Sequence, residues 1–117
     1  MFENLVGRSP KIPYDVRFVF EVDSDEDPIT VFAHKFILSL GSNVFKTQFF
    51  GPMKETTFDI HIVDANPDVF SLFISSIYED VNIRDKSVTF LIELFYISEK
   101  YDVTEVKEAV IETLTEG

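Results

Sequence analysis

The stretch Ile29–Gly41, ITVFAHKFILSLG, changes from strand spacing to helix spacing within a few residues. Apolar side chains alternate up to position 33, as they do along a strand. After position 34 they follow helical spacing at Phe36, Ile37 and Leu40. Gly41 is suited to end such a helix in the left-handed conformation. The stretch therefore predicts a strand that leads directly into a short helix.

A second strand is expected just upstream, because apolar residues alternate at Val16, Phe18, Phe20 and Val22. The acidic, turn-rich segment 23–28 separates it from the strand at 29–33, so the two should form a hairpin. Residues 1–14 contain Pro10 and Pro13 and are expected to form an extended lead-in. The domain proper is assigned to residues 15–117.

Downstream of Gly41, the pattern predicts one more strand and four more helices. Ser42 should cap a helix that ends at Gly51, and a strand should include Ile60. Asn66-Pro67-Asp68 is a strong helix start, and its apolar stripe should be Val69, Phe70, Phe73, Ile74 and Ile77. A further helix should bury Leu91, Leu94, Phe95, Ser98 and Tyr101. Asp102–Glu105 is similar to a capping box for a last helix, with Val106, Ala109, Val110 and Leu114 inward.

Three strands cannot close a barrel, so they should form a small sheet against a cluster of helices. The predicted fold class is α+β. A length of 117 residues fits one domain, and 13 Phe with 45% hydrophobic residues can supply its core.

The composition argues against several functional classes. The net charge of −11 is unfavourable for binding nucleic acid. No apolar run approaches the ~20 residues of a membrane-spanning helix, and the first residues are unlike a secretory signal. We therefore expect no nucleic-acid or membrane partner and a cytoplasmic or nuclear protein.

No catalytic, cofactor or metal site is predicted. Asp23, Asp25 and Asp27 match the first ligands of a calcium loop, but its sixth and twelfth positions are occupied by Pro28 and His34. There is no Cys, the two His lie in different predicted elements, and none of the four Gly belongs to a phosphate-binding loop. We expect neither an enzyme nor a small-molecule substrate.

The ordered motifs resemble a BTB/POZ domain. The first half carries DVRFVF at 15–20, AHKFIL at 33–38 and SNVF at 42–45, and the second half carries IHIVD at 60–64, NPDVF at 66–70 and Ile77-Tyr78. The resemblance implies a helical cluster capped by a three-stranded sheet. Residues 33–55 are most similar to BTB adaptors of cullin-3 ubiquitin ligases.

The resemblance also implies two protein-binding surfaces. Self-association would use a short N-terminal segment and the helix after His34, with the residues Phe2, Leu5, Val6, Lys35, Phe36 and Leu40. A cullin-3-type scaffold would bind near the hydrophobic–any–Glu motif Met53-Lys54-Glu55, with the residues Phe49, Phe50, Met53, Lys54, Glu55 and Tyr78.

The function that this implies is a substrate-adaptor module of a cullin-3-type ubiquitin ligase, acting as a homodimer. The alternative hypothesis is a BTB module that dimerises and recruits corepressors for a transcriptional regulator. A third hypothesis is a tetramerisation domain. The two prolines leave little room for an N-terminal helix, so a weak dimer or a monomer also stays open.

Overall fold

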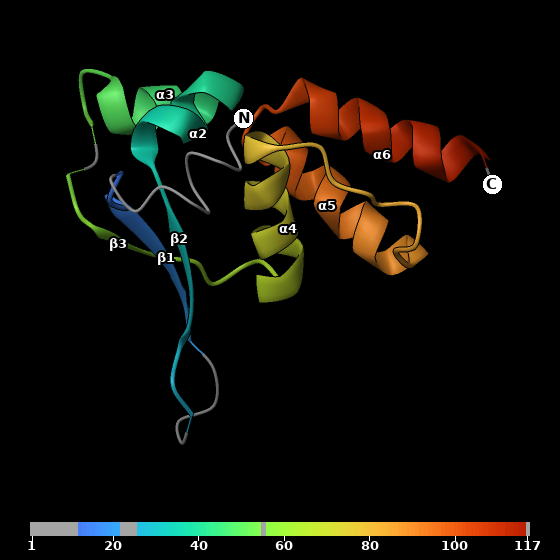
Figure 1. The fold of residues 1–117 in the computed structure, drawn as a ribbon, viewed down its shortest axis with the longest axis horizontal. Coiled ribbons are helices and arrows are strands. Elements are labelled where there is room, and N and C mark those ends of the chain that lie inside the picture. The colour runs from blue at the N-terminus through green and yellow to red at the C-terminus, as the bar shows by residue number, and fades with distance from the viewer. Residues whose placement is uncertain (1–11, 22–25, 55, 117) are drawn as a thin grey trace.

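The computed structural model describes residues 12–21, 26–54 and 56–116 and shows a small sheet packed against helices (Figure 1). The predicted α+β class is confirmed. In chain order the elements are β1 (Val16–Phe20), β2 (Ile29–Ala33), α2 (Lys35–Gly41), α3 (Asn43–Phe50), β3 (Asp59–His61), α4 (Pro67–Tyr78), α5 (Val88–Lys100) and α6 (Thr104–Glu116).

The three strands lie in the order β2-β1-β3. β1 and β2 form the predicted antiparallel hairpin, with Phe18 opposite Val31, and β3 pairs with β1 in parallel, with Phe18 opposite Ile60. A parallel partner needs a crossover connection, and α2 and α3 provide it. Val16, Phe18 and Phe20 face the core as expected, whereas Val22 lies outside the described residues.

The outward side of β1 is less exposed than simple alternation suggests. Val19 lies between the core-facing Phe18 and Phe20 in the strand, and it is outside the main cluster of core side chains. It is nevertheless only 5% exposed. Val19 belongs to the central strand, where Thr30 and His61 flank it from both sides.

Two of the predicted helix starts are confirmed by their caps. The Ser42 hydroxyl oxygen accepts the Phe45 N–H at 3.0 Å and caps α3. The Asn66 side chain accepts the N–H groups of Asp68 and Val69, and Pro67 is the first residue of α4. These side chains satisfy backbone donors that have no partner inside the helix.

The predicted left-handed stop at Gly41 is wrong, because Gly41 is the last helical residue of α2. Glycine is required there for a different reason. A Cβ at this position would lie 2.9 Å from Cγ2 of Ile77 on α4. The stiff, β-branched Ile77 side chain cannot easily move aside, so Gly41 allows α2 and α4 to approach closely.

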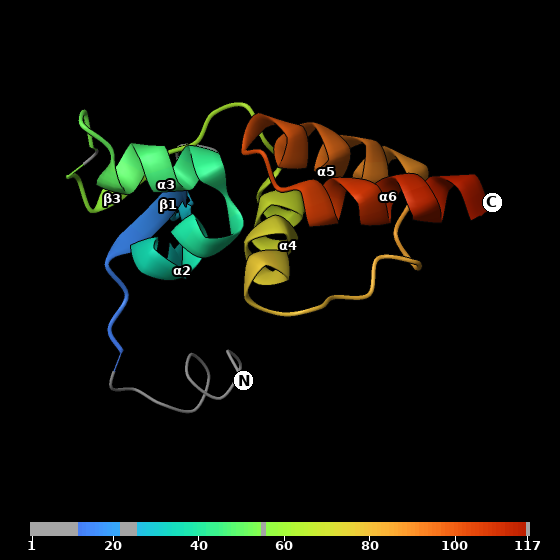
Figure 2. The ribbon, with the colours of Figure 1, turned by 90° about the horizontal axis from the view of Figure 1, so that it is seen from above.

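The predicted capping box at Asp102–Glu105 is also wrong. Asp102 adopts a left-handed conformation, with φ 56°, and its N–H donates to the Glu99 carbonyl at 3.2 Å. Asp102 therefore ends α5, and α6 begins later, at Thr104. This left-handed turn reverses the chain so that α6 runs back along α5 (Figure 2).

The inward face of α6 is narrower than predicted. Val106 and Val110 are buried, as expected, whereas Ala109 and Leu114 are exposed. The reason is that α6 packs mainly against α5, so only one narrow strip of the helix is covered.

An aromatic cluster forms the centre of the core, and α4 lies in its middle. The Phe70 ring packs against Phe18 at 5.0 Å and Phe20 at 5.3 Å between ring centroids. The Phe70 ring also lies 5.9 Å from Phe73 and 6.0 Å from Tyr101, again between ring centroids. The predicted stripe of α4 is confirmed: Val69, Phe70, Phe73 and Ile74 are buried and Ile77 is partly buried.

Candidate protein-interaction surfaces

A buried hydrogen-bond network fixes the junction between β2 and α2. The backbone N–H of His34 donates to the Tyr78 hydroxyl oxygen at 2.8 Å, and His34 Nδ1 lies 2.8 Å from the same oxygen. His34 Nε2 lies 3.0 Å from the Ile12 carbonyl oxygen. Since a carbonyl can only accept, the proton must sit on Nε2, and the Tyr78 hydroxyl donates to Nδ1. The network joins the lead-in, the start of α2 and the end of α4.

Burial raises the pKa of the Tyr78 hydroxyl to about 12, and the hydrogen bond from the His34 backbone opposes this only in part. Tyr78 was predicted to contact a partner. Its hydroxyl is already used inside the chain, so only the accessible edge of its ring is left for such a contact.

The outer face of α2 presents two large apolar side chains. Phe36 is 65% exposed and Leu40 is 61% exposed, because the helix buries Ile37 and Leu38 instead. Phe36 and Leu40 are four residues apart, so they lie on the same face of the helix. They form the α2 face, the described part of the surface predicted for self-association.

The other residues predicted for self-association are placed differently. The Lys35 N–H donates to the Asp15 carboxylate at 2.8 Å, and its Nζ lies 5.5 Å from the Phe49 ring centroid. The Lys35 side chain therefore reaches toward α3. Phe2, Leu5 and Val6 lie outside the described residues.

The end of α3 carries most of the surface predicted for a scaffold. Phe50 and Lys54 are exposed, and Met53 is 93% exposed in the turn that follows the helix. We call these three residues the α3 patch. Glu55, the last residue of the motif, lies outside the described residues.

The inclusion of Phe49 among the partner-binding residues needs correction. Its side chain is only 2% exposed and stacks on Phe45, with 5.6 Å between the ring centroids. Of the two consecutive phenylalanines, the first fills the core and the second faces outward. Helical geometry requires this, because adjacent residues point about 100° apart.

An aromatic group on the outer face of the sheet was not predicted. Arg17 forms a two-pronged ion pair with Asp59, at 2.9 and 2.7 Å. Its guanidinium also lies 5.9 Å from the Phe32 ring and 5.8 Å from the Phe58 ring. The hydrogen bonds to Asp59 raise the pKa of Arg17 and lower that of Asp59. Only pairing between strands distant in sequence brings these residues together.

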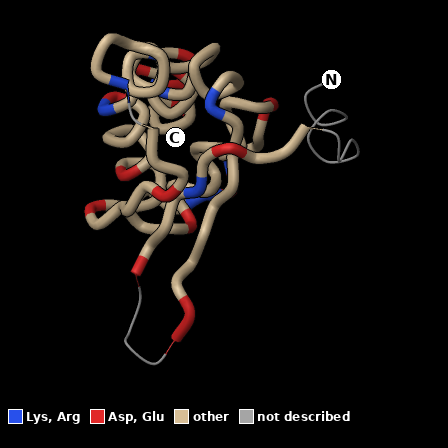
Figure 3. Tube along the Cα trace, turned by 90° about the vertical axis from the view of Figure 1, so that its left-hand side faces the viewer, with Lys and Arg blue, Asp and Glu red and all other residues tan. Residues whose placement is uncertain are grey.

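The charged side chains of the described residues are dispersed and do not form a metal-ligand group. Acidic residues occur in the hairpin, the loops and the helices and do not gather on one side (Figure 3). Within the described ranges, no three His, Asp or Glu side chains are grouped to hold a metal ion. Within the same ranges, none of the helices has the length and apolar character to cross a membrane.

The sequence-family model of the BTB/POZ domain matches residues 8–117, nearly the whole chain. The chain belongs to the BTB/POZ family. The resemblance of the motifs is thereby confirmed, and BTB/POZ domains are protein-interaction modules that generally self-associate and bind other proteins.

Curated relatives show the same family. Human BTB/POZ domain-containing protein 6 is 33% identical over 85 residues, which are 73% of this chain and 15% of that protein. The BTB/POZ and MATH domain-containing protein 3 of Arabidopsis thaliana is 48% identical over 50 residues, 42% of this chain and 12% of that protein. The chain thus spans only a small part of the length of these relatives.

The BTB domain of zebrafish PATZ1 has the same fold. It aligns with a TM-score of 0.74 over 100% of this chain and 90% of the PATZ1 chain, at 18% identity. The BTB/POZ fold predicted from the motifs is therefore confirmed by the arrangement of the backbone.

The burial of the Tyr78 hydroxyl can be tested by its pH dependence. Its pKa is about 12 in the folded chain, against about 10 for an unperturbed tyrosine. The neutral form is favoured by folding, so this contribution to stability is complete below about pH 10 and is lost as the pH rises through about 12. When the pH is raised, a late fraction of the tyrosinate absorbance should appear, at a higher pH than for an unperturbed tyrosine. Tyr101 also contributes to this late fraction, because burial raises its pKa. Tyr78→Phe should reduce that fraction, and an unchanged late fraction would contradict the burial of the Tyr78 hydroxyl.

Proposed function

We propose that this BTB/POZ domain is the scaffold-binding, self-associating module of a substrate adaptor for a cullin-3-type ubiquitin ligase. The observation that carries the proposal is the α3 patch, where Met53 is 93% exposed three residues after the exposed Phe50. The resemblance of residues 33–55 to cullin-3 adaptors supports the same reading.

The α3 patch has the chemistry of a binding hot spot. Methionine is flexible and polarisable, so it can fill an irregular groove on a partner. Aromatic side chains bury a large area with little loss of conformational freedom. Phe50 lies on a helix that is anchored by the preceding residue, Phe49, whose ring is buried in the core. Such a pair can dominate the affinity of an interface whose rim is polar.

The domain would act by positioning and not by catalysis. Holding a substrate near a ubiquitin carrier raises the effective concentration of the acceptor lysine, which increases the rate without a new reactive group. Self-association would double the number of substrate-binding modules presented to the scaffold. The α2 face supports this role, since Phe36 and Leu40 are exposed on one side of a single helix.

The scaffold contact can be tested by measuring the binding of a purified cullin-3 N-terminal region. Met53→Ala and Phe50→Ala should each weaken the complex by roughly fivefold or more, the loss expected for a hot-spot residue. Val63→Ala is the matched control, because Val63 is also apolar and 89% exposed but lies between β3 and α4. It should leave the affinity unchanged.

Wild-type protein that shows no binding at about 100 μM cullin fragment would remove the scaffold proposal. If self-association remained intact in that case, the corepressor-recruiting alternative would become the better reading. Equal losses for Met53→Ala and Val63→Ala would show that the α3 patch is not the contact.

The self-association surface can be tested by light scattering. The wild type should have a mass near twice 13.5 kDa, and Leu40→Asp should shift the population toward the monomer, because it places a charge in an apolar interface. Ile92→Asp on α5 is the control, since this exposed position lies outside the α2 face. A wild-type monomer at every concentration would contradict the proposal, and four subunits would favour a tetramerisation domain.

A further inference from the structure

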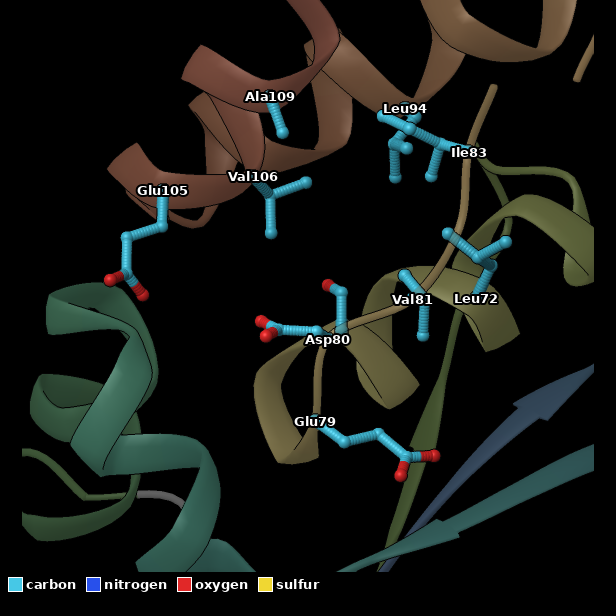
Figure 4. Close-up of a pocket in the computed structure, with 10 residues that line it drawn as sticks. Leu72, Glu79, Asp80, Val81, Ile83, Leu94, Glu105, Val106 and Ala109 are labelled. Atoms are coloured by element: carbon cyan, nitrogen blue, oxygen red, sulfur yellow. The ribbon is translucent and has the colours of Figure 1, made fainter. Parts of the chain in front are cut away.

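A groove runs between the end of α4 and the start of α6, and we call it the α4–α6 groove. It encloses a cavity of about 190 Å³, and its walls are largely apolar at the base (Figure 4). Val106 and Ala109 line it from α6, and Val81 and Ile83 line it from the segment after α4. A pocket with several apolar lining residues and an open mouth can take the stem of a long side chain.

The mouth of this groove is acidic on both sides. Glu105 comes from the first turn of α6, and Asp80 comes from the segment after α4, across the opening (Figure 4). Glu79, which caps the end of α4, adds a third carboxylate that points away from the opening. The C-terminal end of α4 carries the negative end of the helix dipole, which adds to the negative potential at the mouth. Among the described residues, no hydrogen bond or ion pair joins these three carboxylates to a cation.

The chain itself already places a guanidinium against the same face of α6. Residues 105, 109, 112 and 116 lie on one side of this helix, by its 3.6-residue period. At its far end, both terminal nitrogens of Arg84 contact the Glu116 carboxylate. The pKa of Arg84 is raised mainly by Glu116, and Glu112 adds to the effect. The end near Glu105 offers carboxylates of the same kind without an arginine from the described chain.

We propose that the α4–α6 groove binds an arginine side chain from a basic, apolar segment of a partner protein. The guanidinium would lie between Asp80 and Glu105, where its planar donors can reach carboxylates on both walls. The aliphatic stem would lie over Val106 and Ala109, and a neighbouring apolar residue would rest against Val81. We infer an arginine because the negative charge at the mouth of the groove complements the positive charge of a guanidinium.

The size of the cavity agrees with a single side chain. A cavity of roughly 150 Å³ accommodates a benzene molecule, and pockets for drug-sized ligands are usually ~300 Å³ or larger. At about 190 Å³ the groove falls between these values. The residues that line it do not include any member of the α3 patch or the α2 face, so the proposal stands independently of the scaffold proposal.

The test is a titration of the ¹⁵N-labelled chain with the peptide Ac-Leu-Arg-Leu-amide at low ionic strength, followed by NMR. Saturable shifts should be confined to amides of the groove, above all Val81, Val106 and Ala109. The same peptide with citrulline in place of arginine keeps the shape and loses the charge, and it should bind roughly tenfold more weakly.

Variants of the chain separate this site from general attraction to an acidic protein. Glu105→Gln and Asp80→Asn should each weaken binding by roughly twofold to fivefold, as expected for one exposed ion pair. Glu99→Gln removes the same charge from an exposed position on α5 outside the groove and should have no effect beyond error. The cullin-binding measurement with Met53→Ala tests the α3 patch, whereas the peptide titration tests the α4–α6 groove. The scaffold proposal and the groove proposal can therefore fail separately.

Three results would overturn the proposal. The first is a set of shifts that grow without saturation and are spread over the whole acidic surface. The second is equal binding of the arginine and citrulline peptides. The third is an equal loss of affinity for Glu105→Gln and Glu99→Gln, which would indicate attraction to the net charge and not to the groove.

Discussion

The burial of α4 in the aromatic cluster is the constraint on which the rest of the structure depends. Phe70 contacts Phe18 and Phe20 of the sheet and also Tyr101, which follows α5. The inner face of the three-stranded sheet is apolar and must be buried against another layer. α4 supplies that layer, α5 packs against α4, and α6 packs against α5 (Figures 1 and 2).

The same helix also connects the core to the surfaces proposed for binding. At its end, Tyr78 holds the start of α2 through His34, so the α2 face is presented at a fixed angle. The next two residues, Glu79 and Asp80, line the α4–α6 groove, and the Asp80 carboxylate faces its mouth. A helix that is rigid because its middle is buried can position several surface contacts without further support.

Local sequence signals predicted much of this fold, and long-range contacts account for what they missed. Alternation in β1 and the caps at Ser42 and Asn66 depend on neighbouring residues, so they were visible in the sequence. The role of Gly41 depends on Ile77, which is distant in the chain. For the site, the exposure of Met53 agrees with its predicted role, whereas the burial of Phe49 depends on its contact with Phe45 and the surrounding core. The α4–α6 groove could not be predicted, because Asp80 and Glu105 meet only after folding.

A double-mutant cycle between Phe18 and Phe70 tests the central claim most directly. The free energy of unfolding would be measured in urea for Phe18→Leu, Phe70→Leu and the double variant. The 5.0 Å edge-to-face packing of the two rings predicts a coupling energy of about 0.5–1.5 kcal/mol. The same cycle between Phe70 and the exposed Phe36 should be additive. Additivity within about 0.3 kcal/mol for Phe18 and Phe70 would contradict an account in which this contact joins the sheet to the helices.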